Sequence, residues 1–326
     1  IGCHQTVFLE RYDMLDKAAP NAVFLLNTSA KPEDAWNTLP RRMQQQIIDK
    51  NIRFYVIDAY KVAQEAGMRQ RINTIMQTCH FAISGLLPRD EAIAAIKRAV
   101  DQTYGKKGQK VVELNYRAID AAIANLHEVA VPGKVTSLFE RPPVVAANAP
   151  EFVQKVTAVM LAGRGDELPV SALSADGTWP TGTARWEKRN IALEIPVWDE
   201  KLCIACGKCP FVCPHAAIRS KLFDPSQAKD APPTFRHMPL KGKEFPEGAH
   251  IVYQVAPEDC TGCGLCVDIC PVKDKDNPGR RALNMTPQPP LREQERVNFE
   301  YFLRLPEFDR REVRTSVMKS AMLLQP

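Results

Sequence analysis

The chain has 326 residues, of which 45% are hydrophobic and 25% are charged; these values exclude a disordered or fibrous protein. The formal net charge of +5 comes from basic residues scattered along the sequence, which does not indicate a nucleic-acid-binding surface. No apolar run reaches the roughly 18 residues of a membrane span and no secretory signal is visible, so we expect a cytoplasmic protein with no membrane partner.

Residues 1–130 have the pattern of an α/β domain. Short apolar runs predict strands at 22–26 and 53–58, and residues 1–3 read as the end of another strand. Helices are expected between them, at 5–17 and 32–49. This alternation predicts a parallel sheet with crossover helices.

The segment 67–127 has a helical pattern throughout. Gly85 with Pro88, and Gly105 with Gly108, interrupt it. Glycine and proline together end helices, so we expect three successive helices here.

Residues 131–190 are predicted to form a proline-rich linker domain. One helix is expected at 151–161, and the remainder should be extended chain laid on other surfaces. Close to its end lies the charge triplet Glu187-Lys188-Arg189, which we interpret as a solvated surface rather than a functional clamp.

Eight of the ten cysteines form two identical runs of the form C-x2-C-x2-C-x3-C-P, beginning at Cys203 and Cys260. This is the spacing of bacterial ferredoxins that carry two four-iron clusters. A zinc site uses two C-x2-C pairs separated by a longer gap, and disulfides need an oxidising compartment. The runs therefore predict two 4Fe-4S clusters.

In such runs the fourth cysteine turns away from its own loop and reaches the other cluster, so we expect crossed ligation. One cluster should be held by Cys203, Cys206, Cys209 and Cys270, and the other by Cys260, Cys263, Cys266 and Cys213. The runs predict an α+β two-cluster ferredoxin-like domain at 191–285 with an insert at 214–259. A connecting segment with helical stretches should follow at 286–326.

Residues beside the cysteines are expected to shape the cluster surroundings. Glycines at 207, 262 and 264 should let the backbone approach the clusters and bond their sulfur atoms. A dry apolar wall is predicted from Ile204, Val212, Ile218, Leu265, Val267 and Ile269. His215 is not expected to be a ligand, and Cys3 and Cys79, which belong to neither run, should be buried core residues.

Several motifs together resemble the pyruvate:ferredoxin (flavodoxin) oxidoreductase family. They are the cysteine repeat with its long insert, the stretches 71–78 and 168–172, and Asp176-Gly-Thr-Trp-Pro-Thr-Gly-Thr-Ala-Arg-Trp-Glu-Lys-Arg-Asn190. The resemblance covers essentially the whole chain. It implies an internal part of a longer enzyme: most of its third domain, the Glu-Lys-Arg linker domain and the inserted ferredoxin domain.

The resemblance also implies a reaction and its cofactors. Pyruvate would be decarboxylated on thiamine diphosphate with Mg²⁺, coenzyme A would take the acetyl group, and single electrons would pass through three 4Fe-4S clusters to ferredoxin or flavodoxin. Thiamine diphosphate, Mg²⁺ and the third cluster are expected outside this sequence, in the rest of a homodimeric enzyme. The chain contains no nucleotide-binding glycine motif and no nucleophile–base pair, so we assign no catalytic residue and expect no catalysis by it alone.

Two other function classes compete with this interpretation. The first is a stand-alone two-cluster electron-transfer protein with an α/β docking domain, against which the incomplete strand at residues 1–3 argues. The second is a structural or regulatory cluster protein, for which a single cluster and a helix pair for DNA or partner binding would be typical. The paired cysteine runs favour electron transfer over this second class.

Overall fold

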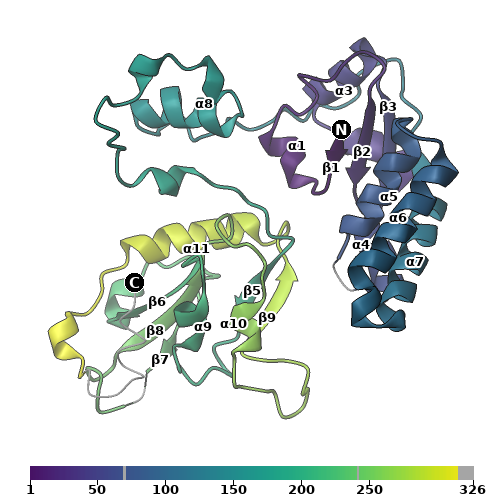
Figure 1. Cartoon of the computed structure of the whole chain (residues 1–326). Coiled ribbons are helices and arrows are strands. Elements are labelled where there is room, and N and C mark those ends of the chain that lie inside the picture. The colour runs from purple at the N-terminus through teal and green to yellow at the C-terminus, as the bar shows by residue number, and fades with distance from the viewer. Residues whose placement is uncertain (69–70, 241, 315–326) are drawn as a thin grey trace. The chain divides into compact units, whose positions relative to one another are not determined.

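The computed structural model describes residues 1–68, 71–240 and 242–314 (Figure 1). The chain divides into two compact units, Ile1–Glu187 and Lys188–Pro326, and the four-part division expected above stays a prediction. Part of the helical tail expected at 286–326 lies outside the described residues. In the described ranges no helix combines the length and the apolar character that crossing a membrane requires.

The first unit contains a four-stranded sheet of order β1-β2-β3-β4 (Figure 1). Strands β1 (Gly2–Cys3), β2 (Val23–Asn27) and β3 (Arg53–Ile57) are parallel, which confirms the predicted strands and their direction. Strand β4 (His127–Glu128) runs antiparallel to β3 and was not predicted. Both residues of β4 are exposed and polar, so no apolar run marked this strand.

Each face of this sheet is covered by its own hydrophobic core. Side chains alternate along β2, so Phe24 points to one face and Leu25 to the other. The first face packs against α1 (Val7–Arg11) and α3 (Arg41–Asp49). The second packs against α4 (Ala59–Glu65), α5 (Asn73–Ser84) and α7 (Gln109–Ala124).

Helices α5, α6 (Arg89–Tyr104) and α7 are the three predicted between 67 and 127. Gly85 ends α5 with a φ of 70°, a left-handed conformation that glycine adopts at low cost. Pro88 precedes α6, and Gly108, with a φ of 102°, precedes α7. The glycine and proline pairs therefore end and start these helices as expected.

Two predicted helices are wrong in extent. Of the range 5–17, in which one helix was expected, only α1 is α-helical. Tyr12 after it is extended, and the Leu15 side chain is buried in the core. The helix expected at 32–49 is divided into α2 (Pro32–Ala35), a 3₁₀ turn (Trp36–Thr38) and α3. Pro40 causes this break, because a residue before proline is pushed out of the helical region, and Leu39 has a ψ of 142°.

Within the first unit, the start of the segment from 131 to 187 is held against α3 by hydrogen bonds from its backbone amides to a side chain of that helix. The buried Gln44 side chain accepts from the amides of Thr136 and Ser137, both at 2.9 Å. The helix expected at 151–161 is present as helical turns, with a π-helical stretch at Val153–Thr157 followed by α8 (Ala158–Leu161).

The second unit is built as two intertwined halves (Figure 1). One half is β5 (Glu194–Trp198), the first cysteine run, α9 (Lys208–Val212) and β6 (Ile218–Phe223); the other is β8 (His250–Val255), the second run, α10 (Leu265–Asp268) and β9 (Leu283–Pro287). Strand β5 pairs antiparallel with β9, and β6 with β8. Each half therefore completes the sheet of the other.

The insert between the cysteine runs is part of this core rather than a free loop. It contributes the sheet β6-β8-β7, in which β7 is Met238–Pro239. Helix α11 (Arg292–Arg304) packs on it, and the buried Lys221 donates from Nζ to the carbonyls of Phe302 and Leu305, both at 2.7 Å. A cation at a helix C-terminus is favourable, although burial lowers the pKa of this amine.

A histidine pair in the insert predicts a loss of stability on acidification. His237 and His250 approach within 2.7 Å through their Nδ1 atoms, and burial lowers the pKa of both. A base whose folded-state pKa is lowered resists protonation, so unfolding becomes easier as pH falls below the ordinary value of 6.5. Urea unfolding from pH 8 to 6 should therefore lose less free energy in His237→Gln than in the unaltered protein. His127→Gln, at an exposed site, is the control, and equal pH slopes in all three proteins would contradict this expectation.

Candidate iron–sulfur site

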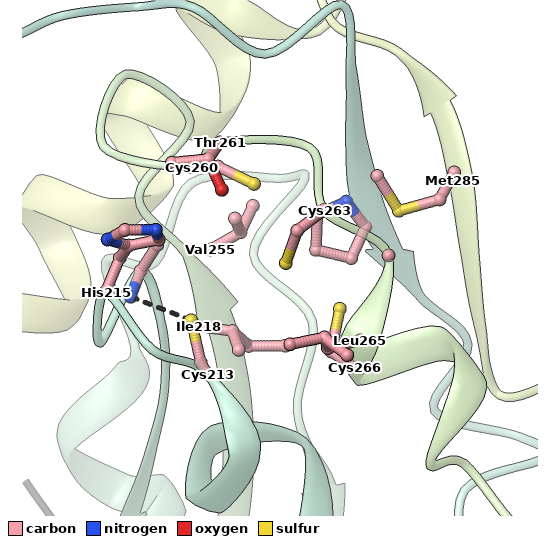
Figure 2. Close-up of a pocket in the computed structure, with 13 residues that line it drawn as sticks. Cys213, His215, Ile218, Val255, Cys260, Thr261, Cys263, Leu265, Cys266 and Met285 are labelled. Carbon is pink, nitrogen blue, oxygen red and sulfur yellow. Dashed lines mark hydrogen bonds between the residues drawn. The ribbon is translucent and has the colours of Figure 1, made fainter. Parts of the chain in front are cut away.

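Two cavities in the second unit are each lined by four cysteines. The first cavity is lined by Cys260, Cys263 and Cys266 of the second run and by Cys213 of the first. Figure 2 shows their four sulfur atoms directed into one space, with Ile218, Val255 and Met285 around them. All ten cysteines of the chain are free thiols.

The second cavity has the complementary set. It is lined by Cys203, Cys206 and Cys209 of the first run and by Cys270 of the second. The eight cysteines of the runs are thus divided between the two cavities. The fourth cysteine of each run lies in the cavity that is lined by the first three cysteines of the other run. This is the grouping that crossed ligation requires.

The cysteine loops are shaped by backbone amides that point at sulfur. The amide of Ala205 donates to Cys203 Sγ and that of Gly262 donates to Cys260 Sγ, both at 3.4 Å. These two residues occupy the same place in the repeat, and both are left-handed, with φ values of 53° and 70°. The amide of Ala217 donates to Cys213 Sγ at 3.3 Å. Such bonds orient the thiol groups before any ligand binds.

Positions 205 and 262 occupy the same place in the repeat, but exchanging glycine and alanine should change the free energy of unfolding unequally at the two positions. A Cβ at Gly262 would lie 3.1 Å from the Glu194 carbonyl oxygen and 3.5 Å from Ala192 Cβ, in addition to the left-handed strain. Gly262→Ala should therefore lower the free energy of unfolding by about 1–2 kcal/mol. Ala205→Gly should have an effect near zero, because relieved strain offsets the greater entropy of the unfolded chain. Anaerobic denaturation would measure both, and equal effects would contradict the argument.

The donor set of each cavity fits a four-iron cluster. Burial, together with the negative charges of Cys260, Cys213 and Cys263, raises the pKa of Cys266 to about 12. Four thiolates in one cavity repel each other, so they ionise together only around a positive centre. All-thiolate coordination is typical of iron–sulfur clusters.

The cavity walls differ from those expected from the sequence. Ile218 is buried, and Val212 and Val267 are half-buried, but Ile204, Leu265 and Ile269 are 57%, 47% and 39% exposed. Ile204 and Leu265 nevertheless each line one cavity, as Ile218 does, so these three are wall residues as expected, although the first two also face solvent. Val212, Val267 and Ile269 line neither cavity, so their inclusion in the wall is wrong. The strands supply most of the buried wall instead, with Trp198, Tyr253, Val255 and Leu283.

The other singled-out residues have structural roles or none in the site. Cys3 and Cys79 are buried as expected, and burial raises the pKa of these thiols to about 11 and about 12. His215 is exposed at the edge of the first cavity. The charge triplet is partly exposed, with Arg189 exposed and Glu187 and Lys188 half-buried, and Lys188 Nζ lies 2.7 Å from Asp259, the residue before Cys260.

Comparison with known families divides the chain into three matches. Residues 1–125 match the family described as pyruvate ferredoxin/flavodoxin oxidoreductase. Residues 139–192 match a domain of unknown function, and residues 202–273 match the 4Fe-4S dicluster domain. The last match contains all eight cysteines of the two cavities, and the second unit thus carries an iron–sulfur domain.

Similar proteins cover the whole chain. It is 50% identical over 323 residues to the pyruvate-flavodoxin oxidoreductase of Rhodospirillum rubrum, with 99% of this chain and 27% of that protein aligned. It is 48% identical to the pyruvate-flavodoxin oxidoreductase of a Nostoc species, over 100% of this chain and 28% of that protein. It is 42% identical to the pyruvate:ferredoxin oxidoreductase of Moorella thermoacetica, over 94% and 26%. The chain spans about a quarter of the length of these curated relatives.

Proposed function

The chain belongs to the pyruvate:ferredoxin/flavodoxin oxidoreductase family, and we propose that it is the electron-transfer part of such an enzyme. The observation that carries the proposal is the grouping of eight cysteines into two crossed sets of four around two cavities. Electrons would leave to ferredoxin or flavodoxin, one at a time.

In this proposal the chain's own residues hold, orient and enclose two clusters. Cys203, Cys206, Cys209 and Cys270 would bind one 4Fe-4S cluster, and Cys260, Cys263, Cys266 and Cys213 the other. When bound, such clusters accept and release single electrons. The amides of Ala205, Gly262 and Ala217 orient the sulfur atoms, and the buried strands β5, β8 and β9 limit the access of water.

The remaining chemistry is proposed for parts of the enzyme outside this sequence. Thiamine diphosphate, Mg²⁺, a third cluster and the sites for pyruvate and coenzyme A would belong there, in a homodimer. Support comes from the relatives, which are named for pyruvate and are about four times as long as this chain. The α/β domain at 1–130, which is part of the first unit, would then act as a structural domain of the larger enzyme.

An anaerobic test in the full protein that contains this chain separates the proposal from a stand-alone electron carrier. Pyruvate with coenzyme A should bleach the visible absorption of the protein, and mixing with oxidised flavodoxin or ferredoxin should restore it. Cys206→Ser with Cys263→Ser should abolish acceptor reduction, whereas Cys3→Ser should not. Acceptor reduction that persists after loss of both clusters would overturn the proposal. A protein that exchanges electrons with flavodoxin but never responds to pyruvate would favour the stand-alone carrier.

A further inference from the structure

Two aromatic residues line the cavity of Cys203, Cys206, Cys209 and Cys270. Trp198 ends β5 and Tyr253 lies in β8, and their rings make an edge-on contact with centroids 5.3 Å apart. They are 6% and 3% exposed, respectively. They thus bring a buried indole N–H and a buried phenol O–H into the wall of the cavity.

Both donors lack a full set of partners in the described part of the chain. Trp198 Nε1 is buried and makes no hydrogen bond. The Tyr253 oxygen accepts from the amide of Gly207 at 3.2 Å, and none of the described residues accepts its own proton. Because Trp198 and Tyr253 both line the cavity of the four cysteines, a group bound in that cavity can accept their protons.

The other cavity has no such donors at the matching places of the repeat. Trp198 precedes Cys203 by five residues, and Val255 precedes Cys260 by the same number. Tyr253 precedes Cys260 by seven residues, and its counterpart before Cys203 is Pro196. Val255 and Pro196 both line the cavity of Cys213 and Cys260. At these two positions the repeat therefore places donors at one cavity and apolar side chains at the other. The cavity of Cys213 and Cys260 is also lined by Thr261 and His215, and Thr261 takes the place that Ile204 has in the first run.

We propose that Trp198 and Tyr253 donate hydrogen bonds to sulfur atoms of the cluster held by Cys203, Cys206, Cys209 and Cys270, and thereby raise the reduction potential of that cluster alone. A reduced cluster carries one more negative charge than an oxidised one, so donors to its sulfur atoms stabilise the reduced form. The inference rests on the proposed function for the presence of clusters, but it concerns a property that the cysteine pattern does not determine.

Redox titration followed by electron paramagnetic resonance tests the inference in the intact, anaerobically purified protein. The spectra of Cys206→Ser and Cys263→Ser assign the signals of the two clusters. Trp198→Phe and Tyr253→Phe should each lower the reduced-to-oxidised ratio of the Cys203 cluster about tenfold at a fixed potential, which is about 59 mV for one electron. The ratio at the Cys260 cluster should change less than about twofold. In the unaltered protein, electron–nuclear double resonance of the reduced Cys203 cluster should show a strongly coupled proton. Its signal should disappear when the protein is exchanged into deuterium oxide.

Matched controls exclude a general effect of these substitutions. Trp36→Phe removes another buried indole N–H without a partner, in the first unit, and Tyr301→Phe removes a hydroxyl that bonds Gln227 at 3.3 Å. Neither should move a potential. Unchanged potentials in cluster-loaded Trp198→Phe and Tyr253→Phe, equal shifts at both clusters, or no exchangeable proton would each overturn the inference. A protein without iron would instead overturn the proposed function.

Discussion

Replacing Cys213 with serine is expected to damage the cluster of Cys260, Cys263 and Cys266 and to spare the cluster of its own run. Cys213 follows α9 and lies in the cavity of the second run, with its sulfur facing that of Cys266 and Cys260 (Figure 2). The variant leaves three thiolates there, so a three-iron species or an oxygen-ligated iron should form. Iron analysis and electron paramagnetic resonance would detect the change.

The mirror variant makes this prediction decisive. Cys270→Ser should alter the cluster of Cys203, Cys206 and Cys209, because Cys270 lies in their cavity. The two variants should therefore perturb opposite signals, while Cys3→Ser, in the first unit, should leave both intact. If Cys213→Ser and Cys203→Ser instead give the same spectral change, ligation is local and the crossed assignment is wrong.

Removal of the clusters, by oxygen or an iron chelator, is expected to unfold the second unit and leave the first folded. The cluster cavities are lined by residues of β5, β8, β9 and the two cysteine loops, and several of these residues belong to the main hydrophobic core of the second unit. Without iron, eight thiols would line two empty cavities, and a metal-organised core of this size loses its folding free energy with the metal. The first unit has separate cores on both sheet faces and does not depend on iron.

Limited proteolysis with far-UV circular dichroism would measure this. After cluster loss, fragments of Ile1–Glu187 should survive digestion while Lys188–Pro326 is degraded, and helical signal should fall in part. Anaerobic protein with intact clusters serves as the control. A chain that keeps the same spectrum and the same melting temperature after iron removal would show that the second unit folds independently of its clusters.

The parts of the fold that were predicted have strong local signals. Strands β2 and β3 are apolar runs, and the glycine–proline pairs around α6 act through backbone conformation alone. The acidic start and apolar end of 32–49 predict a single helix, but Pro40 interrupts it. The three-stranded sheet of the insert has no comparable local signal, because β6 pairs with β8 at the opposite end of the insert.

The residues of the candidate site likewise divide into those with a local sequence signal and those without one. The eight cysteines are recognisable by spacing, because a cube needs ligands at set intervals along a tight loop. Trp198 and Tyr253 are not, since they reach the cavity only through the registers of β5 and β8. The signal that could have found them is their place, five and seven residues before a first cysteine.

The exchange of fourth cysteines between the two halves also determines when each site can be completed during synthesis. Cys203, Cys206 and Cys209 leave the ribosome first, but their fourth partner is Cys270, 67 residues after Cys203. At about 5–20 residues per second, the first three thiols wait several seconds for it. Cys213 likewise waits for Cys260, and strand β9, which closes the sheet with β5, comes later still. Both sites therefore become whole together and late, and the growing chain exposes unmatched thiols until the second half has emerged.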